Sequence, residues 1–348
     1  MRIYIYNGGL GLVGKSGVGQ AIRQQWACLR RAGVPTGDRW TADTAAIQVN
    51  TVLPDSVAAA LLARLRGRKV VCYGHSTMED FRGSFRGSDL LAPLFRRWIT
   101  FCYGLGDVVI TPTEYSRRLL LGYGVKKPVY ALSNGVDTDF FAPSPERRAA
   151  FRRRWRLAEG ERAVISVGHT IARKGLPEFL DLARALPAVR FFWYGWTDPR
   201  LIPTDIQKAL DQAPANVTFP GFVDRETLRE AYCGADVFAF MSHEETEGIV
   251  VLEALACGTP TVVRDIPVYE NWLRDGETIY KASNQREFLQ KVSGLLAGTL
   301  PDVTAAGRRV ARERSYDAVG RRLREIYRRA GILPPPRLTL KQNPVPET

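Results

Sequence analysis

The feature that most constrains the fold of this chain is an alternation of short apolar segments and helical patterns, which occurs twice. The strands expected in the first half are Arg2–Tyr6, Ala46–Val49, Val70–Tyr73, Asp107–Thr111 and Val129–Leu132. The pattern restarts near residue 160, with strands expected at Ala163–Val167, Arg190–Tyr194, Val217–Phe219, Val237–Phe240, Thr261–Val263 and Thr278–Tyr280. Because helical patterns separate these runs, the sequence predicts an α/β fold whose parallel sheets are covered by helices on both faces.

The length agrees with two doubly wound α/β domains. The chain has 348 residues, and a domain contains about 150. The joint is expected around Phe140–Glu161, where prolines and a basic run interrupt the strand–helix rhythm. We therefore divide the chain into residues 1–145, 146–315 and 316–348, the last comprising a basic helix and a proline-rich tail. The composition of that tail, Pro334–Thr348, predicts disorder.

Composition narrows the class of protein. Five cysteines and three histidines lie far apart in the sequence, which argues against a disulfide scaffold and a zinc site. An apolar run of the roughly 18 residues needed for a membrane-spanning helix is absent from the sequence. The net charge of +13 attracts polyanions, so nucleic acid, anionic lipid and phosphorylated ligands all remain possible partners.

The segment Ser242–Pro260 is the richest in groups that could carry chemistry. Gly248 opens a predicted helix and permits a ligand to approach the backbone, where free N–H groups favour a diphosphate. Glu245 in the preceding loop could hold sugar hydroxyls, and Glu253 in the helix could accept hydrogen bonds from a ribose. The alternative is an ordinary acidic N-terminus that stabilises the helix dipole.

The wider pattern resembles a known family. Glu245 and Glu253 lie eight residues apart and are followed by AlaLeuAla-x-Gly-x-Pro at 254–260, which is similar to the donor-site signature of family 4 retaining glycosyltransferases. The segments Asn134–Asp137, Val167–Gly175 and Gly221–Asp236 also resemble parts of that family. The resemblance implies the GT-B fold, in which two Rossmann-like domains face a cleft.

The same resemblance implies a set of site residues. The residues expected to take part in catalysis are His75, Arg173, Lys174 and Glu245. Those expected to bind the donor are Gly17, Gly168, Phe222, Val223, Gly248, Ile249, Val250 and Glu253. A nucleotide sugar is then the substrate, and neither a cofactor nor a metal is expected. His169 stands where the family has an arginine in its phosphate loop; either that diphosphate contact is missing here, or Arg173 beside Lys174 supplies it.

Shorter phrases, including HSTMEDF at 75–81 and EETEGI at 244–249, resemble bacterial enzymes that glycosylate diacylglycerol or monoglycosyl-diacylglycerol. This resemblance implies UDP-glucose or UDP-galactose as donor, a lipid acceptor, and a peripheral position on the inner face of the cell membrane. The amphipathic stretch Leu90–Tyr103 could meet an anionic membrane surface, with Arg96, Arg97 and Trp98 at the headgroups and Leu90, Leu91, Leu94 and Phe95 dipping in. A core helix with an arginine-bearing face is the alternative.

Two other functions compete with this interpretation. Gly9–Ser16 matches the P-loop pattern G-x4-GK[ST], which would make the protein a nucleoside triphosphatase that uses Lys15 and Ser16. A later strand that ends in a magnesium-binding aspartate is not evident in the sequence. The basic surface could also bind nucleic acid, but a groove-reading module is not evident either, so we expect no nucleic-acid partner.

Overall fold

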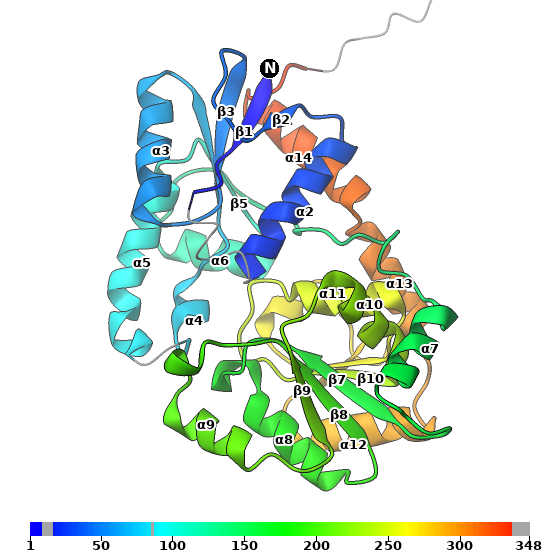
Figure 1. Cartoon of the computed structure of the whole chain (residues 1–348). Helices are drawn as coiled ribbons and strands as arrows, with labels where there is room; N and C mark the ends of the chain where they lie inside the picture. Colours follow the sequence, from blue (N-terminus) through cyan, green and yellow to red (C-terminus); the bar gives the residue numbers. More distant parts are fainter. Residues whose placement is uncertain (9–16, 85–86, 336–348) are drawn as a thin grey trace, which may run out of the picture.

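The computed structural model describes residues 1–8, 17–84 and 87–335, which form two α/β units, each built on a parallel sheet (Figure 1). The first sheet has the strand order β2-β1-β3-β4-β5-β6. Its strands are β1 (Arg2–Ile5), β2 (Thr36–Gly37), β3 (Thr44–Val49), β4 (Lys69–Tyr73), β5 (Val108–Thr111) and β6 (Val129–Ala131). Its helices are α2 (Gly17–Arg31), α3 (Pro54–Leu65), α4 (Met78–Phe81), α5 (Ser88–Gly104) and α6 (Glu114–Gly122).

The second sheet has the order β12-β11-β10-β7-β8-β9. Its strands are β7 (Ala163–Val167), β8 (Arg190–Tyr194), β9 (Val217–Gly221), β10 (Val237–Phe240), β11 (Thr261–Arg264) and β12 (Tyr280–Ala282). The α-helices are α7 (Pro145–Arg154), α8 (Leu176–Ala185), α9 (Thr204–Asp211), α10 (Arg225–Gly234), α11 (Ile249–Cys257), α12 (Gln285–Ala297), α13 (Thr304–Glu313) and α14 (Tyr316–Arg329). Three short 3-10 helices are η1 (Ala172–Lys174), η2 (Pro199–Leu201) and η3 (Pro267–Tyr269).

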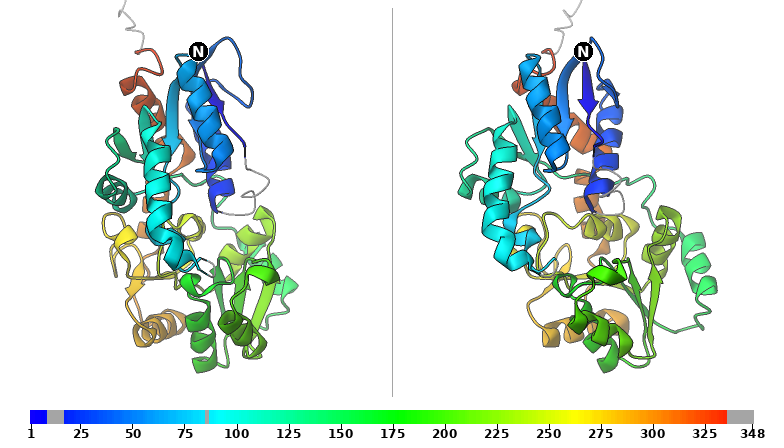
Figure 2. Two further views of the ribbon diagram at one scale, coloured as in Figure 1. Left: turned by 90° about the vertical axis from the view of Figure 1, so that its left-hand side faces the viewer. Right: turned by 60° about the vertical axis from the view of Figure 1, so that its left-hand side comes forward.

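Both sheets are buried on both faces, which explains their nearly continuous apolar strands. In β5, Val108 and Ile110 join the core beneath α2 and α14, whereas Val109 joins the core beneath α3 and α5. Strand β10 divides in the same way, with Phe238 on one face and Val237 on the other. Helices α3 and α5 lie next to each other along one flank of the first unit (Figure 2).

The last helix returns to the first unit. Helix α14 packs on α2, and Leu323 and Tyr327 are completely buried in the core that contains β1. The approach is close because Gly320 has no side chain; a Cβ atom there would lie 2.2 Å from the carbonyl oxygen of Cys28. The chain therefore crosses between the units twice, and a bridge between Val136 and Ser315 joins the two crossings.

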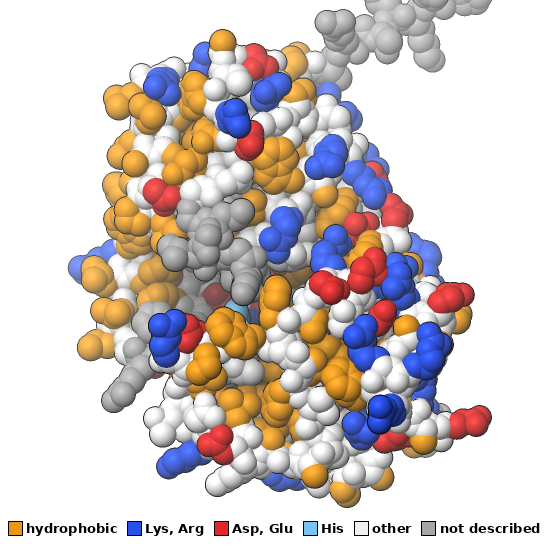
Figure 3. Space-filling model, in the orientation of Figure 1, with side chains coloured by type: hydrophobic (Ala, Val, Ile, Leu, Met, Phe, Trp, Pro, Cys, Tyr) orange, Lys and Arg blue, Asp and Glu red, His pale blue; other side chains and the backbone are white. Residues whose placement is uncertain are grey.

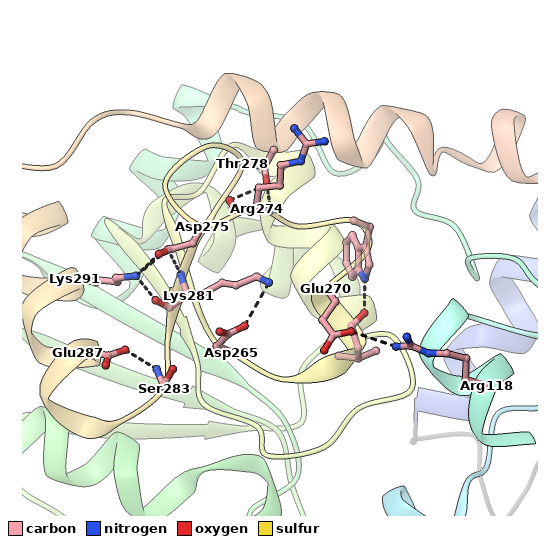
Figure 4. A network of polar contacts seen from close by, with 12 residues as sticks. Arg118, Asp265, Glu270, Arg274, Asp275, Thr278, Lys281, Ser283, Glu287 and Lys291 are labelled. Carbon is pink, nitrogen blue, oxygen red and sulfur yellow. Dashed lines mark hydrogen bonds and ion pairs between the residues drawn. The ribbon is translucent and has the colours of Figure 1, made fainter. Parts of the chain in front are cut away.

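Polar contacts also connect the two units. Arg118 of α6 forms an ion pair at 3.2 Å with Glu270, which follows η3 (Figure 4). The Thr113 hydroxyl at the start of α6 donates to the carbonyl oxygen of Thr246 at 2.9 Å. Together with the buried chain crossings, these contacts hold the two carboxyl edges of the sheets against each other.

The expected α/β class and its two parallel sheets are confirmed, while a few boundaries differ. The strand expected at Thr278–Tyr280 begins at Tyr280 instead, because the Thr278 hydroxyl closes a turn by accepting from the backbone N–H of Arg274 at 2.8 Å (Figure 4). Strand β2 was not expected, since two residues are too few for a periodic signal. Most of the tail predicted to be disordered, residues 336–348, lies outside the described residues.

Candidate active site

A cavity of about 610 Å³ lies between the two units and is lined by segments that follow the strands of both sheets. In parallel α/β sheets, ligands bind at this carboxyl edge. All twelve residues that the sequence analysis singled out line this cavity: His75, Arg173, Lys174, Glu245, Gly17, Gly168, Phe222, Val223, Gly248, Ile249, Val250 and Glu253. The fold therefore brings together residues that are up to 236 positions apart in the sequence.

The start of α11 forms one wall of the cavity. Gly248 has φ 85°, a left-handed conformation that favours glycine. A Cβ atom there would lie 2.8 Å from the hydroxyl oxygen of Tyr269. Ile249 and Val250 follow in the first turn and line the cavity. The unpaired N–H groups of a helix start, together with its dipole, are suited to bind phosphate oxygens.

Glu253 lies further along the same helix and is almost completely buried, with 3% exposed. Its Oε2 accepts a hydrogen bond from the hydroxyl of Tyr232 at 3.1 Å. Burial raises the pKa of Glu253 to about 7, which the Tyr232 bond partly offsets. A carboxylate held at the cavity wall with one oxygen already bonded can accept further hydrogen bonds from ligand hydroxyls.

Lys174 and Glu245 form an ion pair at the cavity. Lys174 Nζ lies 2.5 Å from Glu245 Oε1, and both side chains are mostly buried. Lys174 ends η1 and is followed by Gly175, whose φ is 79°. A Cβ atom at Gly175 would lie 2.3 Å from the carbonyl oxygen of Met241, so the chain must turn on a glycine here. The turn fixes the point from which Lys174 reaches the cavity.

Arg173 connects the two units across the cleft. Its Nη1 forms an ion pair with Asp80 of α4 at 2.8 Å. The same group donates to the carbonyl oxygen of Glu244, also at 2.8 Å. Because Arg173 bonds to both units, an anion that enters the cavity can compete with Asp80 for its guanidinium.

The residue in place of the expected phosphate-loop arginine is also at the cavity. His169 Nδ1 lies 2.9 Å from the carbonyl oxygen of Trp196. Burial lowers the pKa of His169, and the nearby Lys174 and Arg173 lower it further. A neutral imidazole can donate one hydrogen bond but brings no charge. The positive charge at this side therefore comes from Arg173 and Lys174.

His75 lines the same cavity from the first unit. It follows β4 and is 6% exposed. Its ring stacks on that of Tyr73, with centroids 5.5 Å apart. Burial lowers the pKa of His75 to about 4, so the ring is neutral near pH 7. It can serve as a hydrogen-bonding group but not as a cation.

The structure adds cavity residues that sequence reasoning missed. Trp196 follows the end of β8, a position that the strand-end rule could have found. Arg225 begins α10 two residues after Val223, and its guanidinium lies 4.4 Å from the ring centre of Phe140. Arg23 of α2 also lines the cavity, and an arginine on an amphipathic helix gives no signal that separates it from a surface residue.

Other candidates lie elsewhere. The P-loop pattern Gly9–Ser16 falls outside the described residues. His243 pairs with Glu178 at 2.5 Å, away from the cavity lining. Among residues 1–8, 17–84 and 87–335, the structure has no group of three or more His, Cys, Asp or Glu side chains arranged to hold a metal ion. Within the same residues, none of the helices is long and apolar enough to cross a membrane.

The two Rossmann-like units and the cleft between them define the GT-B class of glycosyltransferases. Residues 147–309 match the family model "Glycosyl transferases group 1", and residues 38–140 match "Glycosyltransferase Family 4". This chain belongs to that glycosyltransferase family, as the sequence resemblance implied, and it is an enzyme of this type.

Two curated relatives glycosylate lipids. The chain is 36% identical over 331 residues to the processive diacylglycerol alpha-glucosyltransferase of Acholeplasma laidlawii, covering 94% of this chain and 98% of the relative. It is 28% identical to the alpha-galactosylglucosyldiacylglycerol synthase of Streptococcus pneumoniae, covering 65% of this chain and 60% of that protein. Neither the nucleoside triphosphatase nor the nucleic-acid binder is supported by these relatives.

Solved structures share the fold. Anabaena HepE in complex with UDP-glucose superposes with a TM-score of 0.76 at 16% identity, covering 94% of this chain and all of that chain. A sucrose-phosphate synthase from Thermosynechococcus elongatus gives 0.69 at 20% identity, covering 82% of this chain and 73% of that chain. At such low identity, these likenesses show the fold alone.

Proposed function

We propose that this enzyme transfers glucose from UDP-glucose to diacylglycerol or a glycosyl-diacylglycerol, with retention of the anomeric configuration. The observation that carries the proposal is the cavity between the units, where cations and a helix start lie opposite a neutral histidine. The Acholeplasma laidlawii relative, which this chain matches over 98% of its length, is a diacylglycerol glucosyltransferase. This similarity supports glucose over galactose as the transferred sugar. UDP-galactose is the alternative donor that the test below includes.

The second unit supplies the donor side in this proposal. The diphosphate binds at the start of α11 and is neutralised by Lys174 and Arg173, while Glu253 accepts hydrogen bonds from the ribose hydroxyls. Phe222 and Val223 line the same wall. We assign residues 146–315 to this donor domain, residues 1–145 to the acceptor domain and residues 316–348 to a C-terminal segment, whose helix α14 packs on α2 of the first unit.

The transfer forms a bond between the anomeric carbon and an acceptor hydroxyl oxygen, and it breaks the bond from that carbon to the β-phosphate oxygen. Negative charge grows on the departing UDP, so Lys174 and Arg173 stabilise the transition state more than the ground state. Glu245 is held by Lys174 and orients the sugar hydroxyls. A phosphate oxygen of the donor takes the proton of the acceptor hydroxyl. The acceptor oxygen therefore attacks the anomeric carbon from the same face that the phosphate leaves, and the configuration is retained.

An apolar face on the first unit suggests how the lipid arrives. Large side chains are exposed along α3 and α5, and they gather over the flank of that unit (Figure 3). The most exposed are Leu61, Leu62 and Leu65 of α3 and Leu90, Leu91, Leu94 and Phe101 of α5. Exposed apolar patches of this kind typically mark a partner or membrane surface. We propose that this face lies in the headgroup region of the cytoplasmic leaflet.

Part of the expected membrane face has another role. Phe95 stacks on Phe81 at 4.0 Å between ring centres and is half-buried. The Trp98 indole N–H donates to the carbonyl oxygen of Val52 at 2.7 Å. Both rings therefore pack within the first unit, while Arg96 and Arg97 remain exposed beside the leucines. Residues 1–140 carry 18 basic and 10 acidic side chains, a balance that favours anionic lipid.

The proposal is tested by offering UDP-glucose, UDP-galactose and GDP-mannose to the enzyme in mixed micelles that contain diacylglycerol. NMR of the product then gives the anomeric configuration. We expect an α-linked glucosyl lipid from UDP-glucose and at least about 10-fold lower rates with the other donors. A β-linked product, or transfer only to a water-soluble acceptor, would contradict the proposal.

A further inference from the structure

A chain of buried polar side chains lies behind His75, on the side away from the cavity. It runs through Gln25 of α2 and Gln48 of β3 to Tyr327 of α14. Their exposed fractions are 2%, 0% and 0%. None of these three lines the cavity, whereas His75 does. Buried polar groups are costly unless hydrogen-bonded, so the direction of each bond in the chain matters.

The distances define one continuous chain. The Tyr327 hydroxyl lies 2.6 Å from Gln48 Oε1. Gln48 Nε2 lies 2.5 Å from Gln25 Oε1. Gln25 Nε2 lies 3.0 Å from His75 Nε2. Gln48 Nε2 also donates to Asn50 Oδ1 at 3.4 Å.

The surroundings of the Gln48 amide set the direction of the bonds, because amide nitrogen and oxygen positions follow from the network around them. Gln48 Nε2 lies next to two amide oxygens, Gln25 Oε1 and Asn50 Oδ1, and an amide oxygen only accepts hydrogen bonds. Gln48 therefore donates to both, and its Oε1 accepts from the Tyr327 hydroxyl. Turning the Gln48 amide over would place its oxygen against these two acceptor oxygens.

The direction then passes to the histidine. Gln48 donates to the oxygen of Gln25, so the NH2 group of Gln25 faces His75 Nε2. That nitrogen must accept, and the proton of the neutral ring lies on Nδ1. A cationic ring would place two N–H groups face to face, which agrees with the burial that lowers the pKa of His75. Among the described residues, Nδ1 of His75 forms no hydrogen bond of its own.

We propose that Gln25, Gln48 and Tyr327 are positioning residues that hold His75 as the Nδ1–H tautomer, so that the ring presents a fixed donor to an oxygen of the substrate in the cleft. The assignment of a substrate oxygen rests on the proposed function. It makes the last helix of the chain part of the active site's support, although Tyr327 lies 252 positions after His75.

A network that only satisfies buried polar groups would stabilise the fold without setting the tautomer. The two roles separate in NMR, because two-bond 15N–1H correlations distinguish Nδ1–H from Nε2–H. The full chain has three histidines, so His75 is assigned by its loss in the His75→Gln variant. We expect the Nδ1–H pattern in the wild type without any ligand. The Nε2–H pattern there would overturn the proposal.

Gln25→Glu is the sharpest variant, because an ionised carboxylate only accepts hydrogen bonds. At about pH 8, where a histidine of ordinary pKa is neutral, the His75 proton should move to Nε2. Gln24→Glu is the matched control, since it places the same change one residue away on α2 at a buried position that does not line the cavity. A wild-type pattern in Gln25→Glu would overturn the proposal.

Tyr327→Phe covers the case in which Gln25→Glu does not fold. It removes one hydroxyl far from the cavity and frees the Gln48 amide to turn. A mixture of both tautomers at His75 is then expected, whereas a purely structural network would lower the melting temperature and leave the His75 pattern unchanged. A lower melting temperature with an unchanged His75 pattern would count against the proposal.

Kinetics test the link to the reaction. In Gln25→Glu, kcat should fall about 10-fold or more, the size expected when one hydrogen bond to the transition state is lost. A rise in KM for the donor or for the lipid tells which substrate His75 meets. Unchanged kcat and KM values, with the tautomer moved, would refute the role in the reaction. If the wild type transfers no sugar at all, the proposed function fails while the spectra still decide the tautomer.

Discussion

The two walls of the cleft have the same architecture but different chemistry. The wall from the second sheet carries the ion pair between Lys174 and Glu245, a helix start at Gly248 and the buried carboxyl of Glu253. The wall from the first sheet carries a neutral, buried His75 together with Arg23 and Asp80, and its outer flank is apolar. Two cations at a helix start suit a dianionic donor, and a neutral histidine beside an apolar flank suits a lipid hydroxyl.

The cations at the cavity also differ in where their ion-pair partners lie in the absence of a ligand. Lys174 pairs with Glu245 within its own unit, whereas Arg173 pairs with Asp80 of the opposite unit. Partly buried charges need partners, so each cation is already neutralised by a carboxylate. In the proposed donor complex, a diphosphate competes with Asp80 for Arg173, which would couple donor binding to the contact between the units.

The largest effect is expected from Lys174→Met. The change removes the cation that we propose for the departing diphosphate and leaves Glu245 without its ion-pair partner. We expect kcat/KM to fall about 100- to 1,000-fold, the usual range for losing one electrostatic contact to a transition state. Lys208→Met on α9, an exposed lysine outside the cavity lining, is the control and should stay close to wild type. A fall of less than about 5-fold would remove Lys174 from the donor side.

The next effect concerns the acceptor wall. Leu90 and Leu94 have 87% and 65% of their surface exposed, and burying a leucine in lipid contributes about 1.5–3 kcal/mol. Replacing both with serine should weaken binding to anionic vesicles about 100-fold in a sedimentation assay. UDP binding should stay unchanged, because neither residue lines the cavity. Unchanged vesicle binding would show that this face does not meet the membrane.

A smaller effect is expected at Glu253, the proposed ribose contact. Glu253→Gln keeps the shape but removes the charge, and a hydrogen bond to a charged group is worth about 1.5–3 kcal/mol. The donor KM should rise about 10-fold or more, while the KM for the lipid stays constant. Loss of a buried charge should not lower the melting temperature, so weak binding cannot be ascribed to unfolding. An unchanged donor KM would contradict the role of Glu253.

The same residue predicts a pH dependence. Because burial raises the pKa of Glu253 to about 7, the carboxyl is ionised above that pH and gains a proton below it. The donor KM should therefore rise as the pH falls through 7 in the wild type. Burial also raises the pKa of Glu244 to about 7, so the test is the difference between wild type and Glu253→Gln. Identical profiles would show that Glu253 does not titrate with donor binding.

The smallest effect is expected at Phe222, an exposed ring at the cavity. Packing of a ligand ring against an aromatic side chain is worth about 0.5–1.5 kcal/mol. Phe222→Ala should raise the donor KM about 2- to 10-fold, and Phe222→Leu should recover part of the loss. A change in the KM for the lipid instead would place Phe222 on the acceptor path.

Much of the donor wall could be predicted from the sequence, because its residues come from short, continuous motifs after apolar strands. Glu245, Gly248 and Glu253 fall within nine residues, and the structure places them at one cavity. The acceptor wall depends on contacts between distant segments. Gln25 looks like an ordinary polar residue on an amphipathic helix, and its link to Tyr327 through Gln48 exists only after α14 packs on α2.

The surroundings of individual side chains could not be predicted from the sequence either. The apolar positions of α5 were visible as a pattern, yet only the packing shows that Phe95 stacks on Phe81 while Leu90 stays exposed. The substitution of His169 for arginine was visible too, but its lowered pKa comes from burial and from two neighbouring cations. Periodicity predicts which face of an element is apolar; neighbouring elements decide which residues on it are covered.

The central claim is that Glu253 of the second unit binds the nucleotide and that His75 of the first unit does not. Calorimetric titration of UDP into wild type, Glu253→Gln and His75→Asn tests it most directly. The account predicts about 10-fold weaker UDP binding in Glu253→Gln and an affinity within about 2-fold of wild type in His75→Asn. UDP binding that is lost in His75→Asn and kept in Glu253→Gln would contradict it.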